Sequence, residues 1–271
     1  MLTLDKSILI ISGWDSSGCA GMLVDIATAQ TANLPSCGVI TAITAQSNEQ
    51  VFDIKEIKSK LFQSQLTTAL KNQPVACKVG MLASVQQVEI LAQELPNDLP
   101  IIIDPVITSS SGTRLMQNDV ISAIQDQLFP KCLLLTPNLD ELFQLTQTKP
   151  HELNIEAAIQ SLFTKGCRNI LLKGGHLDKE QLTDSLFQKQ ASNHSKKPLI
   201  TNHFQHPRQP GNYRGTGCLL ATAIACQVAR QPRNLVDACQ IAINYLQHQL
   251  ANTPTNGNHA VKILQQTEST F

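Results

Sequence analysis

Residues 214–218 of the chain read Arg214-Gly215-Thr216-Gly217-Cys218 and run directly into an apolar series at residues 219–228. The spacing of the apolar residues predicts a helix over residues 216–230, with a glycine turn at its start. Backbone N–H groups in the first turn of a helix have no partner within the helix, and the helix dipole adds positive potential there. The stretch is therefore either an anion-binding turn or an ordinary glycine turn capped by Thr216.

The same alternation of strand and helix patterns extends from end to end of the chain, which is typical of a mostly parallel sheet covered by helices, the α/β class. We predict strands at residues 7–12, 37–44, 75–79, 101–106, 132–136, 169–172, 185–188 and 199–203. We predict helices at residues 20–32, 85–94, 119–128, 139–146, 155–165, 216–230 and 235–250. Because the alternation crosses the polar segments 190–197 and 207–212, residues 1–271 are expected to form one domain.

Composition narrows the classes of ligand and the cellular compartment that we expect for this chain. Lys and Arg number 21, as do Asp and Glu, so no basic excess indicates nucleic acid, and a small molecule is the expected ligand. The eight cysteines are scattered singly without a Cys-x-x-Cys pair, which indicates reduced thiols in a cytoplasmic protein. No signal-peptide pattern and no apolar run of membrane-spanning length is present, so a membrane partner is not expected.

Polar or glycine-rich residues follow the predicted strands, where ligands bind in parallel sheets. Each of these segments is also compatible with simple turn chemistry. They are Gly13-Trp14-Asp15-Ser16-Ser17-Gly18-Cys19-Ala20-Gly21, Gln46, Gly80-Met81, Asp104-Pro105-Val106, Thr136-Pro137-Asn138 with Glu141, and Lys173-Gly174-Gly175-His176.

Taken in this order, and with the turn at residues 215–218, these segments resemble the ribokinase-like kinases. The likeness is greatest to the bacterial hydroxymethylpyrimidine and phosphomethylpyrimidine kinases of thiamin biosynthesis, and it is collinear from Ile8 to Leu250. The resemblance implies a three-layer α/β/α sandwich around a mostly parallel sheet. It also implies ATP-dependent phosphorylation of 4-amino-5-hydroxymethyl-2-methylpyrimidine and then of its monophosphate, with Mg²⁺, by a homodimer.

By the same resemblance, five residues would bind the pyrimidine. Gln46 offers a donor and an acceptor to the ring edge, and Met81 and Val106 would wall the ring. On residue type alone, Met81 and Val106 are plain core residues and Gln46 is a surface amide. The implied substrate residues are Gly13, Asp25, Gln46, Met81 and Val106.

Phosphoryl transfer requires neutralised phosphates, a metal ion and an aligned acceptor. The resemblance places Asp104 and Glu141 near Mg²⁺ and Lys173 with Thr216 on the nucleotide. The backbone amides of Gly215, Thr216, Gly217 and Cys218 would form the anion hole for the transferred group. A thiol at a helix N-terminus has a reason to ionise, so Cys218 is either a base or only part of the pocket lining.

Several residues depart from the pattern of these kinases, among them Leu219 in place of a hydroxyl residue and Ser109-Ser110-Ser111-Gly112 where a lysine or threonine is common. Trp14 and Cys19 make the loop beside the substrate bulkier, Arg214 replaces a histidine, and Ile243 falls where a nucleotide-side lysine is common. We interpret Arg214 as a solvated loop residue. These departures leave two alternatives open, a pyridoxal or pyridoxine kinase of the same fold and a non-catalytic pyrimidine-binding relative.

Overall fold

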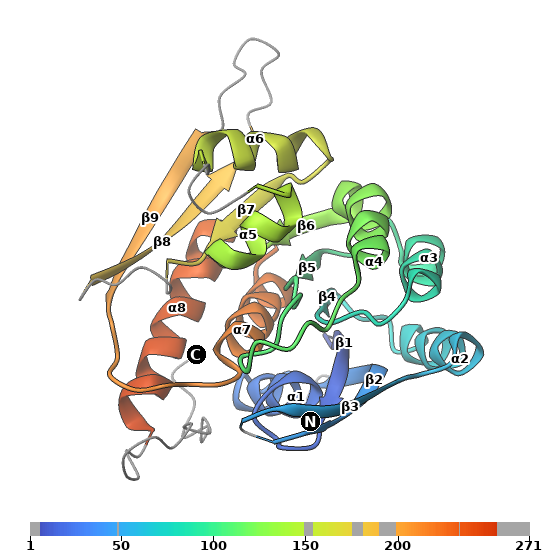
Figure 1. The fold of residues 1–271 in the computed structure, drawn as a ribbon. Coiled ribbons are helices and arrows are strands. Elements are labelled where there is room, and N and C mark those ends of the chain that lie inside the picture. The colour runs from blue at the N-terminus through green and yellow to red at the C-terminus, as the bar shows by residue number, and fades with distance from the viewer. Residues whose placement is uncertain are drawn as a thin grey trace.

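In the part of the chain that the structure describes, one nine-stranded sheet has the order β3-β2-β1-β4-β5-β6-β7-β8-β9 (Figure 1). The structure, a computed structural model, describes residues 6–47, 49–148, 154–174, 181–189, 199–232 and 234–253. The predicted loop at residues 190–197 and the pair Gly175-His176 lie outside these ranges.

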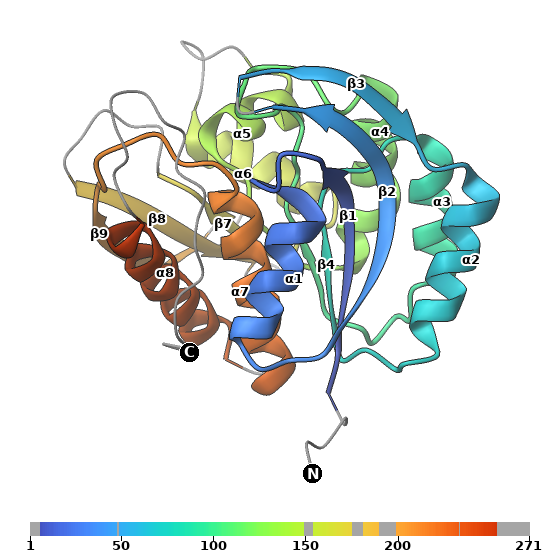
Figure 2. The ribbon, with the colours of Figure 1, turned by 90° about the horizontal axis from the view of Figure 1, so that it is seen from below.

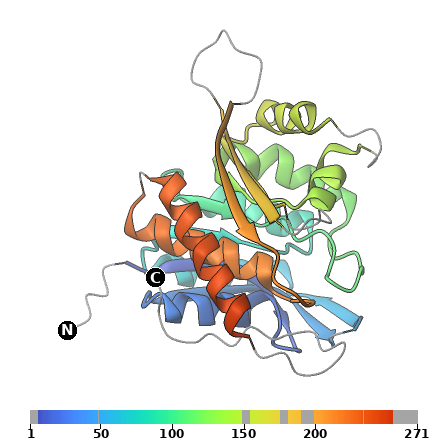
Figure 3. The same ribbon diagram turned by 90° about the vertical axis from the view of Figure 1, so that its left-hand side faces the viewer.

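The centre of the sheet is parallel and its two margins are antiparallel. The parallel strands are β2 (Ser36–Gln46), β1 (Ile8–Asp15), β4 (Ala76–Val79), β5 (Ile101–Ile103), β6 (Cys132–Leu135) and β7 (Asn169–Leu172). The antiparallel neighbours are β3 (Val51–Glu56) at one margin and the hairpin of β8 (Gln181–Gln188) and β9 (Leu199–Pro207) at the other, which Figure 3 shows beside α8. The sheet is therefore mostly parallel, as the sequence predicts.

Helices cover both faces of the sheet, which gives the three layers (Figure 2). One face carries α1 (Gly21–Thr31), α7 (Thr216–Arg230) and α8 (Leu235–Asn252). The other face carries α2 (Ser59–Leu70), α3 (Val85–Glu94), α4 (Asn118–Ala123) with the helical turns that follow it at residues 124–131, α5 (Leu139–Thr146) and α6 (Ile155–Thr164).

Strand β1 shows why both faces must be covered. Ile8 and Ile10 pack into the core beneath α7, while Leu9 and Ile11 pack into the core beneath α2 and α3, and all four side chains are fully buried. Successive side chains of a strand point to opposite faces, so a continuous apolar run predicts a strand buried on both sides. The carboxyl end of this buried strand carries Gly13, Trp14 and Asp15 to the edge of the sheet.

The sequence patterns did not predict two of the observed elements, β3 and α2, and both lie at the same margin of the sheet. Strand β3 is half exposed and rich in charge, so its apolar run is too weak to predict a strand. Helix α2 did carry a signal, because its buried residues Phe62, Leu66 and Ala69 recur at helical spacing. In addition, β8 begins at Gln181 instead of Ser185, and β9 ends at Pro207 instead of His203.

Replacing Phe62 tests whether α2 belongs to the core. The Phe62 side chain is fully buried, so we expect Phe62→Ala to lower the free energy of unfolding by about 3–5 kcal/mol through lost burial and a cavity. Phe52 in β3 is 65% exposed, so Phe52→Ala is the matched control and should change stability by less than about 0.5 kcal/mol. Urea denaturation measures both, and equal effects would contradict this packing.

Candidate active site

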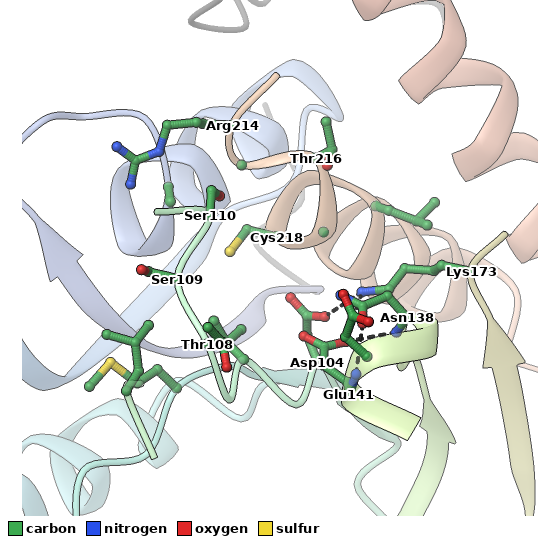
Figure 4. A pocket seen from close by; sticks show the side chains of 18 of the residues that line it. Asp104, Thr108, Ser109, Ser110, Asn138, Glu141, Lys173, Arg214, Thr216 and Cys218 are labelled. Atoms are coloured by element: carbon green, nitrogen blue, oxygen red, sulfur yellow. Dashed lines mark hydrogen bonds and ion pairs between the residues drawn. The ribbon is translucent and has the colours of Figure 1, made fainter. Parts of the chain in front are cut away.

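A cavity of about 1080 Å³ opens where the parallel strands end at their carboxyl termini (Figure 4). Its walls come from the segments after β1, β2, β4, β5, β6 and β7 and from the first turn of α7. The cavity brings together all but one of the residues to which the resemblance assigns a role at the substrate, the nucleotide, the metal ion or the transferred group. They are Gly13, Gln46, Met81, Asp104, Val106, Glu141, Lys173, Gly215, Thr216, Gly217 and Cys218.

The turn before α7 could not be built with another residue in place of Gly215. Its φ of +75° is left-handed, and a Cβ atom there would lie 2.3 Å from the backbone oxygen of Cys19. Gly215 is also the N-cap, and no side chain in the described ranges caps α7. This excludes the alternative of a turn capped by Thr216 and leaves the first amides of α7 at the cavity without a side-chain partner.

Opposite this turn, the Lys173 ammonium lies between two buried carboxylates. Its Nζ atom is 3.1 Å from Asp104 Oδ1 and 3.6 Å from Glu141 Oε2 (Figure 4). Gly217 lies against this cluster, because a Cβ atom on it would be 3.4 Å from both Asp104 Oδ2 and Lys173 Nζ. The lack of a side chain at Gly217 therefore brings the N-terminus of α7 close to the charged groups.

Local structure fixes Glu141 at the start of α5. Asn138 accepts a hydrogen bond from the Glu141 N–H at 2.8 Å, and Glu141 Oε2 accepts one from the Asn138 N–H at 2.7 Å, which together make a capping box. Burial raises the pKa of Glu141 to about 7, although Lys173 opposes this. Burial alone would lower the pKa of Lys173, but Asp104 and Glu141 outweigh it and raise that pKa.

Asp104 and Glu141 suit a magnesium ion that arrives with a nucleotide. Carboxylate oxygens are the hard ligands that Mg²⁺ prefers, and one or two of them commonly hold the ion together with water and phosphate oxygens. Within the described ranges, no group of three or more His, Cys, Asp or Glu side chains could hold a metal by itself. The donor set therefore fits an ion shared with the substrate phosphates better than a resident metal centre.

The expectation that Cys218 ionises easily is wrong. The side chain is buried, and burial raises the pKa of its thiol to about 12, although Lys78 partly opposes the shift. Burial therefore favours the neutral thiol, which supports the alternative that Cys218 only lines the pocket.

The expectation that Asp25 contacts the substrate is also corrected. Its side chain is fully buried and is not part of the cavity wall. Lys78 Nζ lies 2.8 Å from Asp25 Oδ2, and the Thr222 hydroxyl donates to Oδ1 at 2.8 Å. Asp25 lies one layer behind the cavity because the α1 face that carries it packs on the sheet and on α7.

Gln46, Met81 and Val106 all lie in the cavity wall. The Gln46 side-chain oxygen accepts a hydrogen bond from the Thr44 hydroxyl at 3.4 Å, and its backbone N–H donates to Ser16 at 2.9 Å. Met81 is buried, whereas Val106 is half buried, and both lie in the wall. Trp14 also lines the cavity.

Arg214, Cys19 and Ile243, which also depart from the pattern of these kinases, lie in environments that the sequence analysis did not predict. Arg214 is not solvated, because it is only 3% exposed, donates to the Ser47 carbonyl and lies 3.8 Å from Asp15 Oδ2. Cys19 supports the Gly215 turn from behind, and Ile243 is buried in the core. An apolar Ile243 is therefore explained by packing against α7 and its neighbours.

A group of cavity residues at the β8–β9 hairpin was not predicted. Asp184 accepts a hydrogen bond from the Gly174 N–H at 2.7 Å, and its other oxygen lies 3.3 Å from His206 Nε2. Leu246 and Leu250 of α8 line the same end of the cavity. Alternation along 181–188 could have revealed Asp184, but the predicted strand began one residue after it.

This fold and this site define a ribokinase-like phosphotransferase. The cavity at the strand ends, the lysine between two carboxylates and the glycine turn are compatible with phosphoryl transfer. The protein is accordingly a kinase.

The chain belongs to the phosphomethylpyrimidine kinase family, whose model matches residues 15–263. A hydroxymethylpyrimidine/phosphomethylpyrimidine kinase of Escherichia coli K12 is 32% identical over 255 residues, covering 91% of each chain. One from Haemophilus influenzae is 34% identical over 236 residues, covering 83% of this chain and 84% of the relative.

Solved structures agree on the fold. The phosphomethylpyrimidine kinase of Clostridium difficile 630 superposes with a TM-score of 0.71 at 28% identity, covering 90% of this chain and 98% of that one. The pyridoxal kinase of Staphylococcus aureus in complex with AMP-PCP and pyridoxal superposes with a TM-score of 0.80 at 25% identity, covering 96% and 93%. The architecture is thus shared by a phosphomethylpyrimidine kinase and a pyridoxal kinase.

The raised pKa of Glu141 predicts a pH dependence of stability. Between the ordinary value of 4.5 and about 7, the folded protein keeps a proton on Glu141 that the unfolded chain releases. The free energy of unfolding should therefore fall as pH rises through this range, by roughly 1–3 kcal/mol. Glu141→Gln preserves the capping box but does not titrate, so it should lack this fall.

Urea denaturation of both proteins across this pH range, without nucleotide or Mg²⁺, measures the difference. The same pH dependence in wild type and in the Glu141→Gln variant would contradict the assignment.

The neutral thiol of Cys218 leads to a second prediction. We expect Cys218→Ala to retain kcat within about fivefold of wild type, because loss of a true general base costs ~10² or more. Cys226 is buried two turns further along α7, so Cys226→Ala controls for lost packing. A hundredfold loss in Cys218→Ala alone would restore the base role.

Proposed function

We propose that this kinase transfers the γ-phosphoryl group of ATP, with Mg²⁺, to 4-amino-5-hydroxymethyl-2-methylpyrimidine and then to the resulting monophosphate. The observation that carries the proposal is the arrangement of the cavity. Gly13, Gln46, Met81 and Val106 line the same space as the uncapped turn of α7 and the Lys173 cluster. The names of the curated relatives and of the family model support the pyrimidine as substrate.

The substrate end of the cavity suits an aminopyrimidine. A primary amide both donates and accepts hydrogen bonds, so Gln46 can pair with the ring nitrogen and the amino group together. Met81 and Val106 offer apolar contacts to the ring faces. Gly13 leaves room for the ring to approach the backbone at the end of β1.

The groups that face one another across the cavity would together carry out phosphoryl transfer. The hydroxymethyl oxygen attacks the γ-phosphorus, the bond from this phosphorus to the bridging oxygen breaks, ADP leaves, and the hydroxyl proton passes to an oxygen of the transferred phosphoryl group. The amides of residues 215–218 donate to the oxygens of the transferred group, while Lys173 balances their charge. Mg²⁺ held by Asp104 and Glu141 together with the phosphates would neutralise further charge. Leu246 and Leu250 supply an apolar wall at the far end of the cavity for the nucleotide base.

An ADP-release assay with the hydroxymethylpyrimidine, its monophosphate and pyridoxal side by side tests the proposal. Turnover of both pyrimidines at a higher kcat/KM than pyridoxal is the expected result. Preference for pyridoxal would overturn the proposal in favour of pyridoxal kinase activity, an alternative that the likeness to the Staphylococcus aureus pyridoxal kinase keeps open. Omitting Mg²⁺ should abolish turnover of every substrate, which tests the proposed ion.

Changing Gln46 tests the substrate end separately. We expect Gln46→Leu to raise KM for the pyrimidine about tenfold or more, because the site loses its paired donor and acceptor. KM for ATP should stay within about twofold, since the amide is not on the proposed nucleotide side. Gln50→Leu, an exposed amide in the next turn, is the control. An unchanged pyrimidine KM would remove Gln46 from the site.

The homodimer implied by the resemblance stays a prediction. It is supported by the margin of the sheet at β3, where large apolar side chains are exposed, among them Phe52 at 65% and Ile43 at 47%. An unpaired strand edge flanked by apolar side chains is a surface that a second copy can cover.

A further inference from the structure

Arg214 brings a buried positive charge to the cavity wall, and no step described so far uses it. The side chain is only 3% exposed, and a guanidinium group is not deprotonated in proteins. Arg214 is the residue directly before Gly215, the N-cap of α7, and Figure 4 shows it on the other side of Cys218 from Lys173. Two cations therefore flank the first turn of α7 in one cavity.

The Arg214 guanidinium has few partners for so buried a charge. One terminal nitrogen donates to the Ser47 carbonyl, and the other lies 3.8 Å from Asp15 Oδ2, which is too long for a hydrogen bond. Asp15 uses its other oxygen, Oδ1, to accept from the N–H and the hydroxyl of Ser17 at 2.9 and 2.8 Å. Within the described residues, Arg214 Nε and Asp15 Oδ2 are both buried without a hydrogen-bond partner.

The unused N–H donors of Arg214 fit an anionic ligand. Burial of a charged group is unfavourable unless the charge is paired and its donors are hydrogen-bonded, and Arg214 meets neither condition fully. The planar fork of a guanidinium group matches the oxygens of a phosphate group, to which it can donate two parallel hydrogen bonds. A phosphate group in the cavity would complete the partners that the protein leaves open.

The contacts of Arg214 place it at the end of the cavity proposed for the pyrimidine. Ser47, which accepts its hydrogen bond, follows Gln46, and Asp15 is the last residue of β1. Ser16 joins these two strand ends, because its hydroxyl accepts from the Gln46 N–H at 2.9 Å and donates to the Gln46 carbonyl at 3.1 Å. Arg214 thus belongs to the acceptor side of the site, whereas Lys173 belongs to the proposed nucleotide side.

The two proposed acceptors differ in charge. The hydroxymethyl group is neutral, whereas a phosphate monoester carries about −1.5 to −2 at neutral pH, because its second pKa is about 6. In the second transfer an oxygen of the acceptor phosphate attacks the γ-phosphorus, the bond to the bridging oxygen breaks and ADP leaves, so two anionic groups must approach each other. Lys173 is already shared by Asp104 and Glu141. The second transfer therefore needs a further cation.

We propose that Arg214 binds the phosphate group of the monophosphate acceptor and is a specificity-determining residue for the second phosphorylation. Its unused N–H donors hydrogen-bond the acceptor phosphate beside the turn at residues 215–218, while Ser47 and Asp15 hold the guanidinium in place. The alcohol has no phosphate group, so the first phosphorylation does not use this contact. This inference rests on the proposed function.

Equilibrium binding to Arg214→Gln tests the inference without any turnover. Isothermal titration calorimetry in the absence of ATP measures Kd for the hydroxymethylpyrimidine and for its monophosphate. We expect Kd for the monophosphate to rise about tenfold to hundredfold and Kd for the alcohol to stay within about twofold, because only the monophosphate loses charge-assisted hydrogen bonds. Arg214→Lys keeps the charge without the fork, so its Kd for the monophosphate should lie between those of wild type and Arg214→Gln.

Arg114→Gln is the matched control, because Arg114 also lines the cavity but already uses its donors. Its Nε donates to the Met116 carbonyl at 2.8 Å, and its terminal nitrogen donates to the Asn118 side chain. We expect this variant to keep the wild-type Kd for both ligands. An equal loss of monophosphate affinity in Arg114→Gln and Arg214→Gln would contradict the proposal, because it would show a general effect of positive charge around the cavity.

Asp15→Asn separates phosphate binding from support of the loops. Asparagine keeps an oxygen that can accept from Ser17 but removes a negative charge beside Arg214. If Arg214 binds the phosphate, Kd for the monophosphate should fall roughly threefold in this variant, because one repulsive charge is gone. Weaker binding of both ligands in Asp15→Asn would instead assign the Asp15–Arg214 contact a structural role only.

The outcomes keep this inference apart from the proposed function. If Arg214→Gln weakens both pyrimidines equally, the phosphate contact is overturned and the proposed function stands. If wild type neither binds nor phosphorylates either pyrimidine, the proposed function fails first. If wild type phosphorylates the alcohol but does not bind the monophosphate, this inference and the second transfer both fail, and the first transfer stands. The ADP-release assay with the alcohol also checks that Arg214→Gln retains a folded site.

Discussion

The site depends on the Lys173 ammonium, which holds the carboxylates of Asp104 and Glu141 together out of water. These three side chains follow the ends of different strands, and two buried carboxylates this close would repel each other without a cation between them. The attraction between Lys173 and the two carboxylates holds the ends of β5, β6 and β7 together in one wall of the cavity. It also leaves a charged cluster whose lysine and carboxylates can be shared with the phosphates and metal of a nucleotide.

The second constraint is the close approach of the backbone to neighbouring groups, which glycine permits at two points. Gly217 lets the first turn of α7 lie against Asp104 and Lys173, and Gly174 passes so close to Thr183 that a Cβ atom would lie 2.2 Å from the Thr183 backbone oxygen. The Gly174 N–H is in turn held by Asp184. The position of Lys173 is therefore set by the β8–β9 hairpin as well as by β7, which explains why an antiparallel margin of the sheet matters to a site at parallel strand ends.

Burial shapes the chemistry of Cys218 and Asp25. Cys218 was expected to be either a base or part of the pocket lining, and Asp25 was expected to contact the substrate, but α7 packs on the sheet and on α1, and both side chains are buried there. Burial raises the pKa of the Cys218 thiol to about 12, and it also raises the pKa of Asp25, although Lys78 opposes that shift. Asp25 is therefore a buried group behind the cavity and not part of its wall.

By itself, the sequence determined the α/β class, most elements and which segments follow the strands, because strand and helix periodicity and the Gly215 turn are local properties of the chain. Its resemblance to a family then placed the candidate residues of the cavity, Asp25 excepted. Helix α2, the full β8–β9 hairpin, and the environments of Asp25, Arg214 and Cys218 were decided only by the tertiary structure. The physical reason is that burial and charge neighbours arise between segments far apart in sequence: Lys78 lies 53 residues from Asp25 and Thr222 lies 197 residues from it.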